Sequence, residues 1–207
     1  MKKIDPQKSA LIIQDMQNDV IIEGGAFCGE PGPAEHAKKQ NVIANAKKLA
    51  AAAREKGMPV IHVWYVVDKG APGLKQNAPL FQAILATNGV VRGTWGAAPV
   101  KGLEAKKGDF VVEKMRMCAF TDTTLETILK GCGVERLVIT GAWTNFSIEH
   151  TARTGADFGY ECTVVSDATS TINDEWQHAA LNFALTNIAE IGTTEEALKA
   201  LGAKKSK

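Results

Sequence analysis

Apolar runs of strand length alternate along this chain with longer stretches that have the length and polarity of surface helices. The pattern predicts strands at 10–14, 60–65, 110–113, 137–140, 162–166 and 188–191. It predicts helices at 41–56, 121–130, 146–158, 174–185 and 194–201. A Gly-rich loop is expected at 23–33, and a long irregular segment at 68–99 with one helical piece at 80–86. A loop of that length in a compact domain is often functional.

Repeated alternation of strands and helices predicts an α/β fold with a parallel sheet and helices on both of its faces. No G-x-G-x-x-G follows a predicted strand, and the chain has no P-loop pattern. These gaps disfavour enzymes that bind dinucleotides or nucleotide phosphates.

The composition restricts the class of protein and its partners, but it does not indicate a function. The 207 residues are 45% hydrophobic and 23% charged, which is ordinary for one soluble globular domain spanning 1–207. The net charge of +1 suggests neither nucleic acid nor a membrane as a partner. We expect a flexible basic tail at 203–207 and, because no signal peptide is evident, a cytoplasmic protein. The four cysteines are scattered and expected to be reduced.

Three predicted strands lead into side chains that can do chemistry. Asp15 follows the first strand, Lys114 follows the third, and the strand ending at Thr140 leads into a segment that contains Ser147. In an open parallel sheet, ligands bind outside the carboxyl ends of the strands. An acid, an amine and a hydroxyl would therefore meet at one edge, which points to a hydrolase.

Each of these residues also has a plainer explanation. Asp15 could form a turn, Lys114 could extend to solvent, and Ser147 could satisfy a backbone amide in the first turn of a helix. His150, three residues after Ser147, is better explained as a residue of the helix surface. A Ser-His-Asp triad is not assembled by this sequence.

The strings around the three residues together resemble one known family. Asp15 lies in Ala-Leu-Ile-Ile-Gln-Asp-Met-Gln-Asn-Asp, Lys114 in Val-Val-Glu-Lys-Met-Arg-Met-Cys-Ala-Phe, and Ser147 in Gly-Ala-Trp-Thr-Asn-Phe-Ser-Ile-Glu-His. In this order they resemble the isochorismatase-like (cysteine hydrolase) superfamily over roughly 9–201. The resemblance implies a doubly wound, Rossmann-type sheet of about six parallel strands. It also implies hydrolysis of a small molecule, with an amide or carbamoyl C–N bond as the favoured target.

The resemblance further implies a role for each residue. Asp15 would be the general acid or base, Lys114 its charge partner, and Ser147 would stand where many members carry a nucleophilic cysteine. A hydroxyl is a weaker nucleophile than a thiol and is not ionised near neutral pH. Three alternatives are open: an assisted serine nucleophile, vinyl-ether hydrolysis without a covalent intermediate, or an engineered substitution that inactivates the enzyme. A catalytically silent binding or interaction protein is a further alternative.

By the same resemblance, the Ala142–Trp143 peptide is expected to be cis, so that the backbone N–H groups of Trp143 and Ser147 form an oxyanion hole. The expected substrate contacts are Gln17, Trp64, Trp95, Cys118, Phe120 and Trp143. For Cys118, a buried inert role is preferred over that of a relocated nucleophile. No cofactor is expected, and no metal, because 62–68 offers no pair of histidines. A homo-oligomer, either dimer or tetramer, is expected.

Overall fold

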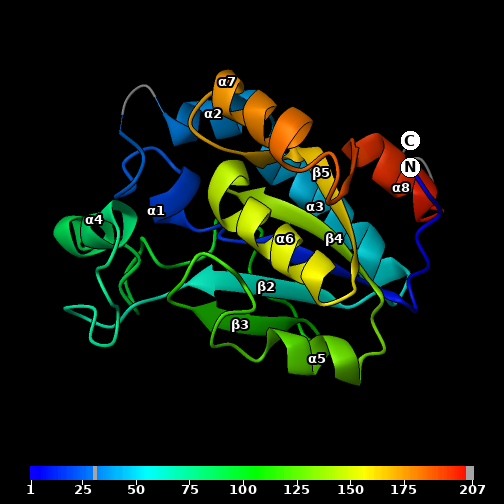
Figure 1. The fold of residues 1–207 in the computed structure, drawn as a ribbon, viewed down its shortest axis with the longest axis horizontal. Helices are drawn as coiled ribbons and strands as arrows, with labels where there is room; N and C mark the ends of the chain where they lie inside the picture. Colours follow the sequence, from blue (N-terminus) through cyan, green and yellow to red (C-terminus); the bar gives the residue numbers. More distant parts are fainter. Residues whose placement is uncertain (30–31, 204–207) are drawn as a thin grey trace.

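The computed structural model describes residues 1–29 and 32–203. Among them, six parallel strands form one sheet in the order β3-β2-β1-β4-β5-β6 (Figure 1). The strands are β1 (Ser9–Gln14), β2 (Val60–Tyr65), β3 (Phe110–Lys114), β4 (Arg136–Ala142), β5 (Glu161–Ser170) and β6 (Glu190–Gly192). The predicted α/β fold with a doubly wound parallel sheet is confirmed. Of the expected tail at 203–207, Ala203 donates its amide to the Leu198 carbonyl, and 204–207 lie outside the described residues.

Helices connect the strands and cover both faces of the sheet. They are α1 (Asn18–Ile21), α2 (Pro33–Lys39), α3 (Val42–Glu55), α4 (Pro79–Thr87), α5 (Leu125–Gly131), α6 (Glu149–Asp157), α7 (Asp174–Ala179) and α8 (Thr194–Ala200). Two π-helical turns adjoin them: η1 (Thr144–Ile148) leads into α6, and η2 (Ala180–Ala184) follows α7.

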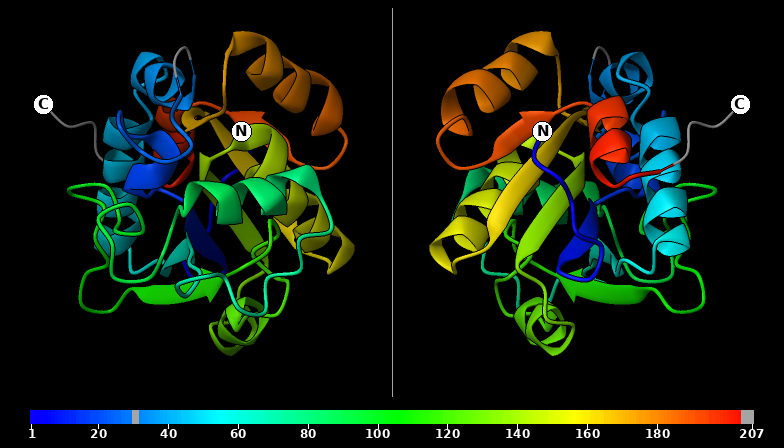
Figure 2. Two further views of the ribbon diagram at one scale, coloured as in Figure 1. Left: turned by 90° about the vertical axis from the view of Figure 1, so that its left-hand side faces the viewer. Right: turned by 90° about the vertical axis from the view of Figure 1, so that its right-hand side faces the viewer.

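The central strand β1 is buried on both faces, and its alternating side chains feed two separate cores. Leu11 and Ile13 pack with residues of α2, α3 and α8. Ala10 and Ile12 pack with residues of α5, α6 and η2. Figures 1 and 2 show the sheet between these two layers of helices.

The strand order reverses between β1 and β4, since β2 and β3 lie on one side of β1 while β5 and β6 lie beyond β4. The carboxyl ends of the strands face α1 and α4, on the left in Figure 1. An open α/β sheet binds its ligands at such a switch point, outside the carboxyl ends of the strands. The end of β1, where Asp15 follows, is therefore the expected place for a site.

Several predicted boundaries shift. The sequence pattern did not show α1 or α2. The helix predicted at 121–130 corresponds to α5, which begins at Leu125 rather than at Thr121. The Thr123 hydroxyl donates to the Ala119 carbonyl and accepts from the Leu125 amide, so side-chain bonds shape the preceding turn. β5 runs on to Ser170, past the predicted 162–166, because its end pairs with Ala142 of β4.

The short helix α1 is held by tertiary contacts rather than by its own propensity. The carboxylate of Asp19 accepts hydrogen bonds from the amides of Ala26, at 2.9 Å, and Val90, at 2.7 Å. It thereby joins α1 to two loops that are far apart in sequence.

Gly141 marks the closest approach of β4 to β1. Its φ is +122°, and a Cβ built on it would lie 1.9 Å from the carbonyl oxygen of Gln14. We expect Gly141→Ala to lower the free energy of unfolding by about 3 kcal/mol or more, since backbone must move and a strained φ must be kept. Gly131→Ala, at the open end of α5, is the control and should be neutral or stabilising by up to about 1 kcal/mol. Urea denaturation measures both, and equal stabilities would contradict the prediction.

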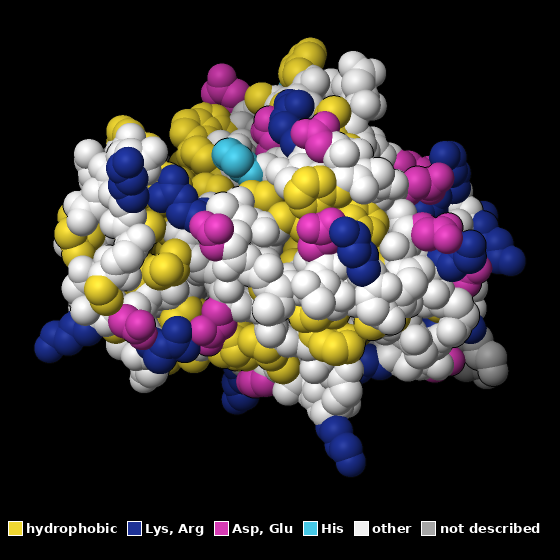
Figure 3. All heavy atoms as spheres, turned by 60° about the horizontal axis from the view of Figure 1, so that its bottom comes forward, with side chains coloured by type: hydrophobic (Ala, Val, Ile, Leu, Met, Phe, Trp, Pro, Cys, Tyr) yellow, Lys and Arg dark blue, Asp and Glu magenta, His cyan; other side chains and the backbone are white. Residues whose placement is uncertain are grey.

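Charges of both signs are mixed on the surface that carries α5, with apolar side chains between them (Figure 3). This view agrees with the near-zero net charge of the sequence.

Within the described part of the chain, no helix has both the length and the apolar character needed to cross a bilayer.

Candidate active site

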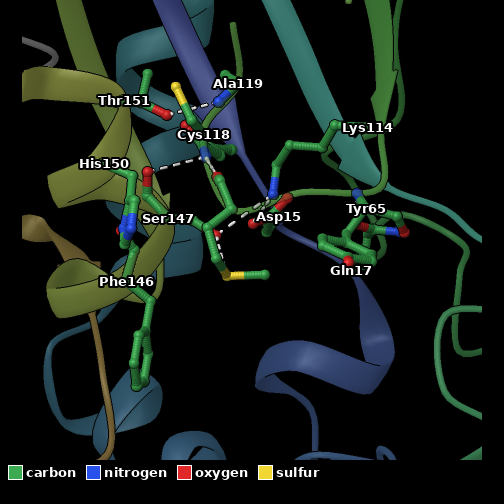
Figure 4. A network of polar contacts seen from close by, with 12 residues as sticks. Asp15, Gln17, Tyr65, Lys114, Cys118, Ala119, Phe146, Ser147, His150 and Thr151 are labelled. Carbon is green, nitrogen blue, oxygen red and sulfur yellow. Dashed lines mark hydrogen bonds and ion pairs between the residues drawn. The ribbon is translucent and has the colours of Figure 1, made fainter. Parts of the chain in front are cut away.

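Asp15 and Lys114 form a buried ion pair, as the sequence predicted. The Lys114 Nζ lies 2.9 Å from Asp15 Oδ2 and 3.4 Å from Ser147 Oγ. Figure 4 shows the three side chains converging from three different segments. Lys114 is 99 positions from Asp15 and 33 from Ser147 in sequence, so the tertiary fold brings the three side chains together.

The geometry of the sheet explains how Lys114 reaches Asp15. β2 lies between β1 and β3, so the lysine side chain must cross the end of one strand. Tyr65, the last residue of β2, pairs in register with Lys114, and its ring centroid lies 4.6 Å from the ammonium. The tyrosine thus supplies an aromatic face over which a cation is stabilised. Asp15 itself has φ 53° and is anchored by its amide, which donates to the Val63 carbonyl.

Burial governs the electrostatics of this pair. Asp15 and Lys114 are 4% and 3% exposed, respectively. Burial raises the pKa of Asp15 above its ordinary value, although Lys114 and the Ser147 hydroxyl favour the carboxylate. Burial likewise lowers the pKa of Lys114, although Asp15 favours the ammonium. The Oδ1 atom of Asp15 is buried and has no hydrogen-bond partner among the described residues, so an acceptor is left for a reacting group.

Ser147 is held in η1, the π-helical turn that follows β4. Its backbone carbonyl accepts a hydrogen bond of 3.1 Å from the Gln14 side chain, which also donates to Met117. Its hydroxyl lies 3.7 Å from the Met117 sulfur. The Ala142–Trp143 peptide is cis, which confirms that prediction. Gln14 positions the loop after β3 against η1, and its place beside Asp15 in an apolar strand was the signal for it in the sequence.

A small cavity of about 60 Å³ opens beside Asp15 and Ser147. Its wall is mainly apolar and comes from the end of β2, from α4, from the segments after β1 and β3, and from η1. We call it the active-site cavity. A larger hollow of about 930 Å³, lined in part by Ile21, Cys28 and Lys38, contains none of the three reactive residues.

Of the six predicted substrate contacts, only Trp143 lies in the wall of this cavity. Gln17 is fully buried, and its amide bonds to the backbone of Tyr65 and Ala97 at 2.7 to 2.9 Å. It therefore joins the end of β2 to the segment before β3, and both of its amide N–H groups are already used. Trp95 is 56% exposed and does not line the cavity.

The other three predicted contacts also lie outside the wall. Trp64 is next to Tyr65 in a strand, so its side chain points to the opposite face of the sheet. Phe120 packs on Phe158 and Tyr160, with ring centroids 5.3 and 6.0 Å apart. Cys118 is buried, and its sulfur accepts a bond from the Phe120 amide, which agrees with an inert role.

Conversely, sequence reasoning missed most of the wall. Its missed members include Phe27, Tyr65, Leu80, Ile84, Met117 and Phe146. Tyr65 ends a strand, so the rule that found Asp15 could have found it as well. Leu80 and Ile84 lie in the helical piece of the long irregular segment, where only the fold shows which side faces the site.

The remaining polar candidates lie elsewhere. His150 is exposed, and its ring bonds to the Phe146 carbonyl on the surface of the helix. His62 is buried against Asp109, 3.0 Å away, in a cluster with Arg54. No group of three or more His, Cys, Asp or Glu side chains within 1–29 and 32–203 is arranged to hold a metal ion.

Comparisons with known proteins show which solved structures share this fold. A solved cysteine hydrolase from Pseudomonas syringae pv. phaseolicola has 22% identity and a TM-score of 0.86, covering 98% of this chain and 96% of that chain. An isochorismatase family protein from Burkholderia thailandensis has 27% identity and a TM-score of 0.80, covering 98% and 100%. A nicotinamidase/pyrazinamidase from Bacillus subtilis has 25% identity and a TM-score of 0.73, covering 89% and 99%. The isochorismatase domain model matches residues 9–196, and the chain therefore belongs to the isochorismatase family of hydrolases.

Proposed function

We propose that this hydrolase cleaves the C–N bond of a small amide or carbamoyl compound. One observation supports the proposal most directly: the Lys114 ammonium contacts both the Asp15 carboxylate, at 2.9 Å, and the Ser147 hydroxyl, at 3.4 Å. In the proposal, Asp15 is the acid–base group and Ser147 is the hydroxyl nucleophile. The similar nicotinamidase/pyrazinamidase bears the name of an amide-cleaving enzyme, which supports the same reaction class.

In the proposed reaction, Ser147 Oγ attacks the amide carbonyl carbon while the Asp15 carboxylate accepts the hydroxyl proton. The free Oδ1 atom of Asp15 is available for that proton. The N–H groups of Trp143 and Ser147 stabilise the oxyanion. Collapse of the tetrahedral intermediate breaks the C–N bond, and Asp15 returns the proton to the leaving nitrogen. Water then hydrolyses the acyl-serine ester, with Asp15 again accepting a proton and releasing it to re-form the hydroxyl.

Two other functions keep a specific observation in their favour. The raised pKa of Asp15 suits a general acid, which is what protonation of a vinyl ether requires. Ser147 in place of a thiol would suit a protein without covalent catalysis, including a silent binding protein. The intact buried pair of Asp15 and Lys114 argues against the silent alternative, because an unused buried ion pair adds little to stability.

The pH dependence of the rate distinguishes a general-base role of Asp15 from a general-acid role. If Asp15 accepts a proton, kcat/KM for an amide should fall about tenfold per pH unit below its raised pKa. If Asp15 donates a proton to an ether, the rate should instead fall as the pH rises past that pKa. Initial rates across pH 4 to about 9 measure the profile, with the melting temperature recorded at each pH. An amidase activity that increases steadily toward acid would contradict the base role of Asp15.

A substrate panel tests the proposal itself. Amides and carbamoyl compounds are assayed for ammonia, and isochorismate is assayed for pyruvate. Ammonia release supports amide hydrolysis, whereas pyruvate release alone would replace it with ether hydrolysis. If the folded protein releases neither ammonia nor pyruvate, the result favours the catalytically silent alternative. The expected dimer or tetramer stays a prediction, which light scattering on the same sample tests.

A further inference from the structure

We infer that the substrate is a small amide with an uncharged, apolar acyl group, and that amides bearing a carboxylate on that group are rejected. The inference rests on the proposed function, because it assumes that the acyl carbon meets Ser147. It goes further by naming the chemistry that the active-site cavity accepts. The apolar cavity wall and the existing contacts of Lys114, Arg92 and Arg116 carry it.

Most side chains in the cavity wall are apolar. Leu80 and Ile84 come from α4, Phe146 from η1, and Phe27 from the loop before α2. Ile84 is buried, and Leu80 is half-buried. Four wall residues carry a polar or charged group. Asp15 and Ser147 are the reactive residues, and Tyr65 and Trp143 are aromatic side chains with one polar atom each.

The polar tips of those aromatic residues are already occupied. The Tyr65 hydroxyl donates to the Met115 carbonyl. The Trp143 indole N–H donates to the Val20 carbonyl at 3.0 Å. Both rings therefore present only their carbon surfaces to a ligand, and neither can pair with a carboxylate without losing an existing bond.

The cations near the site are also engaged. Lys114 pairs with Asp15 and is not part of the wall. Arg92 forms ion pairs with Asp68 and Glu113, both at 2.8 Å, and lies outside the wall. Arg116 stacks on the Phe81 ring, 3.6 Å from its centroid, and likewise lies outside the wall. A substrate carboxylate in this cavity would thus lose its hydration without gaining Lys114, Arg92 or Arg116 as a partner, which is unfavourable.

The cavity also limits size. Its volume of about 60 Å³ is well below that of the apolar cavity of ~150 Å³ that binds benzene in another protein. A short aliphatic acyl group suits a space of this size. The acceptable substrate is therefore a short-chain aliphatic amide.

Isovaleramide and malonamate test the charge preference directly. The two amides have nearly the same shape, but an isopropyl group in the first is replaced by a carboxylate in the second. We expect kcat/KM for ammonia release to favour isovaleramide on the order of 100-fold, since the carboxylate loses its hydration without gaining a partner. Equal rates, or a preference for malonamate, would overturn the inference while leaving amide hydrolysis intact. Ammonia from no amide at all would instead overturn the proposed function.

A charge placed in the wall should reverse part of this preference. Leu80→Lys brings an ammonium into the cavity from α4, whereas the control Leu85→Lys puts it on the same helix at a position 38% exposed and outside the wall. We expect Leu80→Lys to reduce the preference for isovaleramide about tenfold or more, and Leu85→Lys to leave it unchanged. The ratio of the two rates does not depend on how much of each variant is folded. An identical ratio in both variants would contradict the apolar wall as the source of selectivity.

Discussion

Asp15→Asn is expected to lower kcat/KM about 10³-fold while the protein stays folded. The amide has nearly the shape of the carboxylate, but it cannot accept a proton from Ser147 or return one to the leaving nitrogen. Loss of a positioned general acid–base group typically costs about 10² to 10⁴ in rate. Initial rates on the best amide, with circular dichroism to confirm folding, measure the effect. Unchanged turnover in this variant would remove Asp15 from the mechanism.

Glu113→Gln is the matched control for this experiment. Glu113 adjoins Lys114 in β3, but its side chain is 41% exposed and pairs with Arg92. Glu113 carries the same charge as Asp15. Because it is the neighbour of Lys114 in β3, its side chain lies on the opposite face of the strand from that of Lys114. We expect its activity to stay within about twofold of the native value, because exposed ion pairs contribute little. A comparable loss in both variants would mean that net charge, rather than the buried pair, controls the rate.

Position 147 is expected to give the second large effect. If Ser147 attacks the carbonyl carbon, Ser147→Ala should lose about 10³-fold or more in kcat/KM. Ser147→Cys should gain about tenfold or more on the same amide, because a thiol is partly ionised and a stronger nucleophile. Steady-state rates on a reactive amide or ester measure both variants, and mass spectrometry detects an acyl group on the cysteine.

The outcomes of that comparison separate the alternatives for this residue. Equal rates for serine and alanine would support direct attack by water or ether hydrolysis driven by Asp15. Activity that appears only with cysteine would mean that serine disables the chain. Thermal melting of the three proteins controls for folding, since Ser147 is only 3% exposed and its carbonyl bonds to Gln14.

The alternation of apolar and polar stretches was sufficient to predict the parallel sheet, because strand burial and helix periodicity are local properties. It also placed Asp15 and Lys114 at strand ends, which in a parallel sheet implies one common edge. Their ion pair at 2.9 Å also depends on the strand order, because the Lys114 side chain reaches across the end of β2. The short helices α1 and α2 were missed because non-local contacts hold them: Val90 donates its amide to Asp19 of α1, and Thr171 donates its amide to His36 of α2.

The sequence by itself thus determined the fold class and the reactive pair. Only the tertiary structure decided which side chains surround the substrate, since that depends on which face of a strand or helix meets the switch point. Trp64 and Tyr65 are neighbours in β2, yet the sheet gives Tyr65 alone to the site. Leu80 and Ile84 reach it because the long segment folds back over the strand ends, and no local periodicity records such a non-local contact.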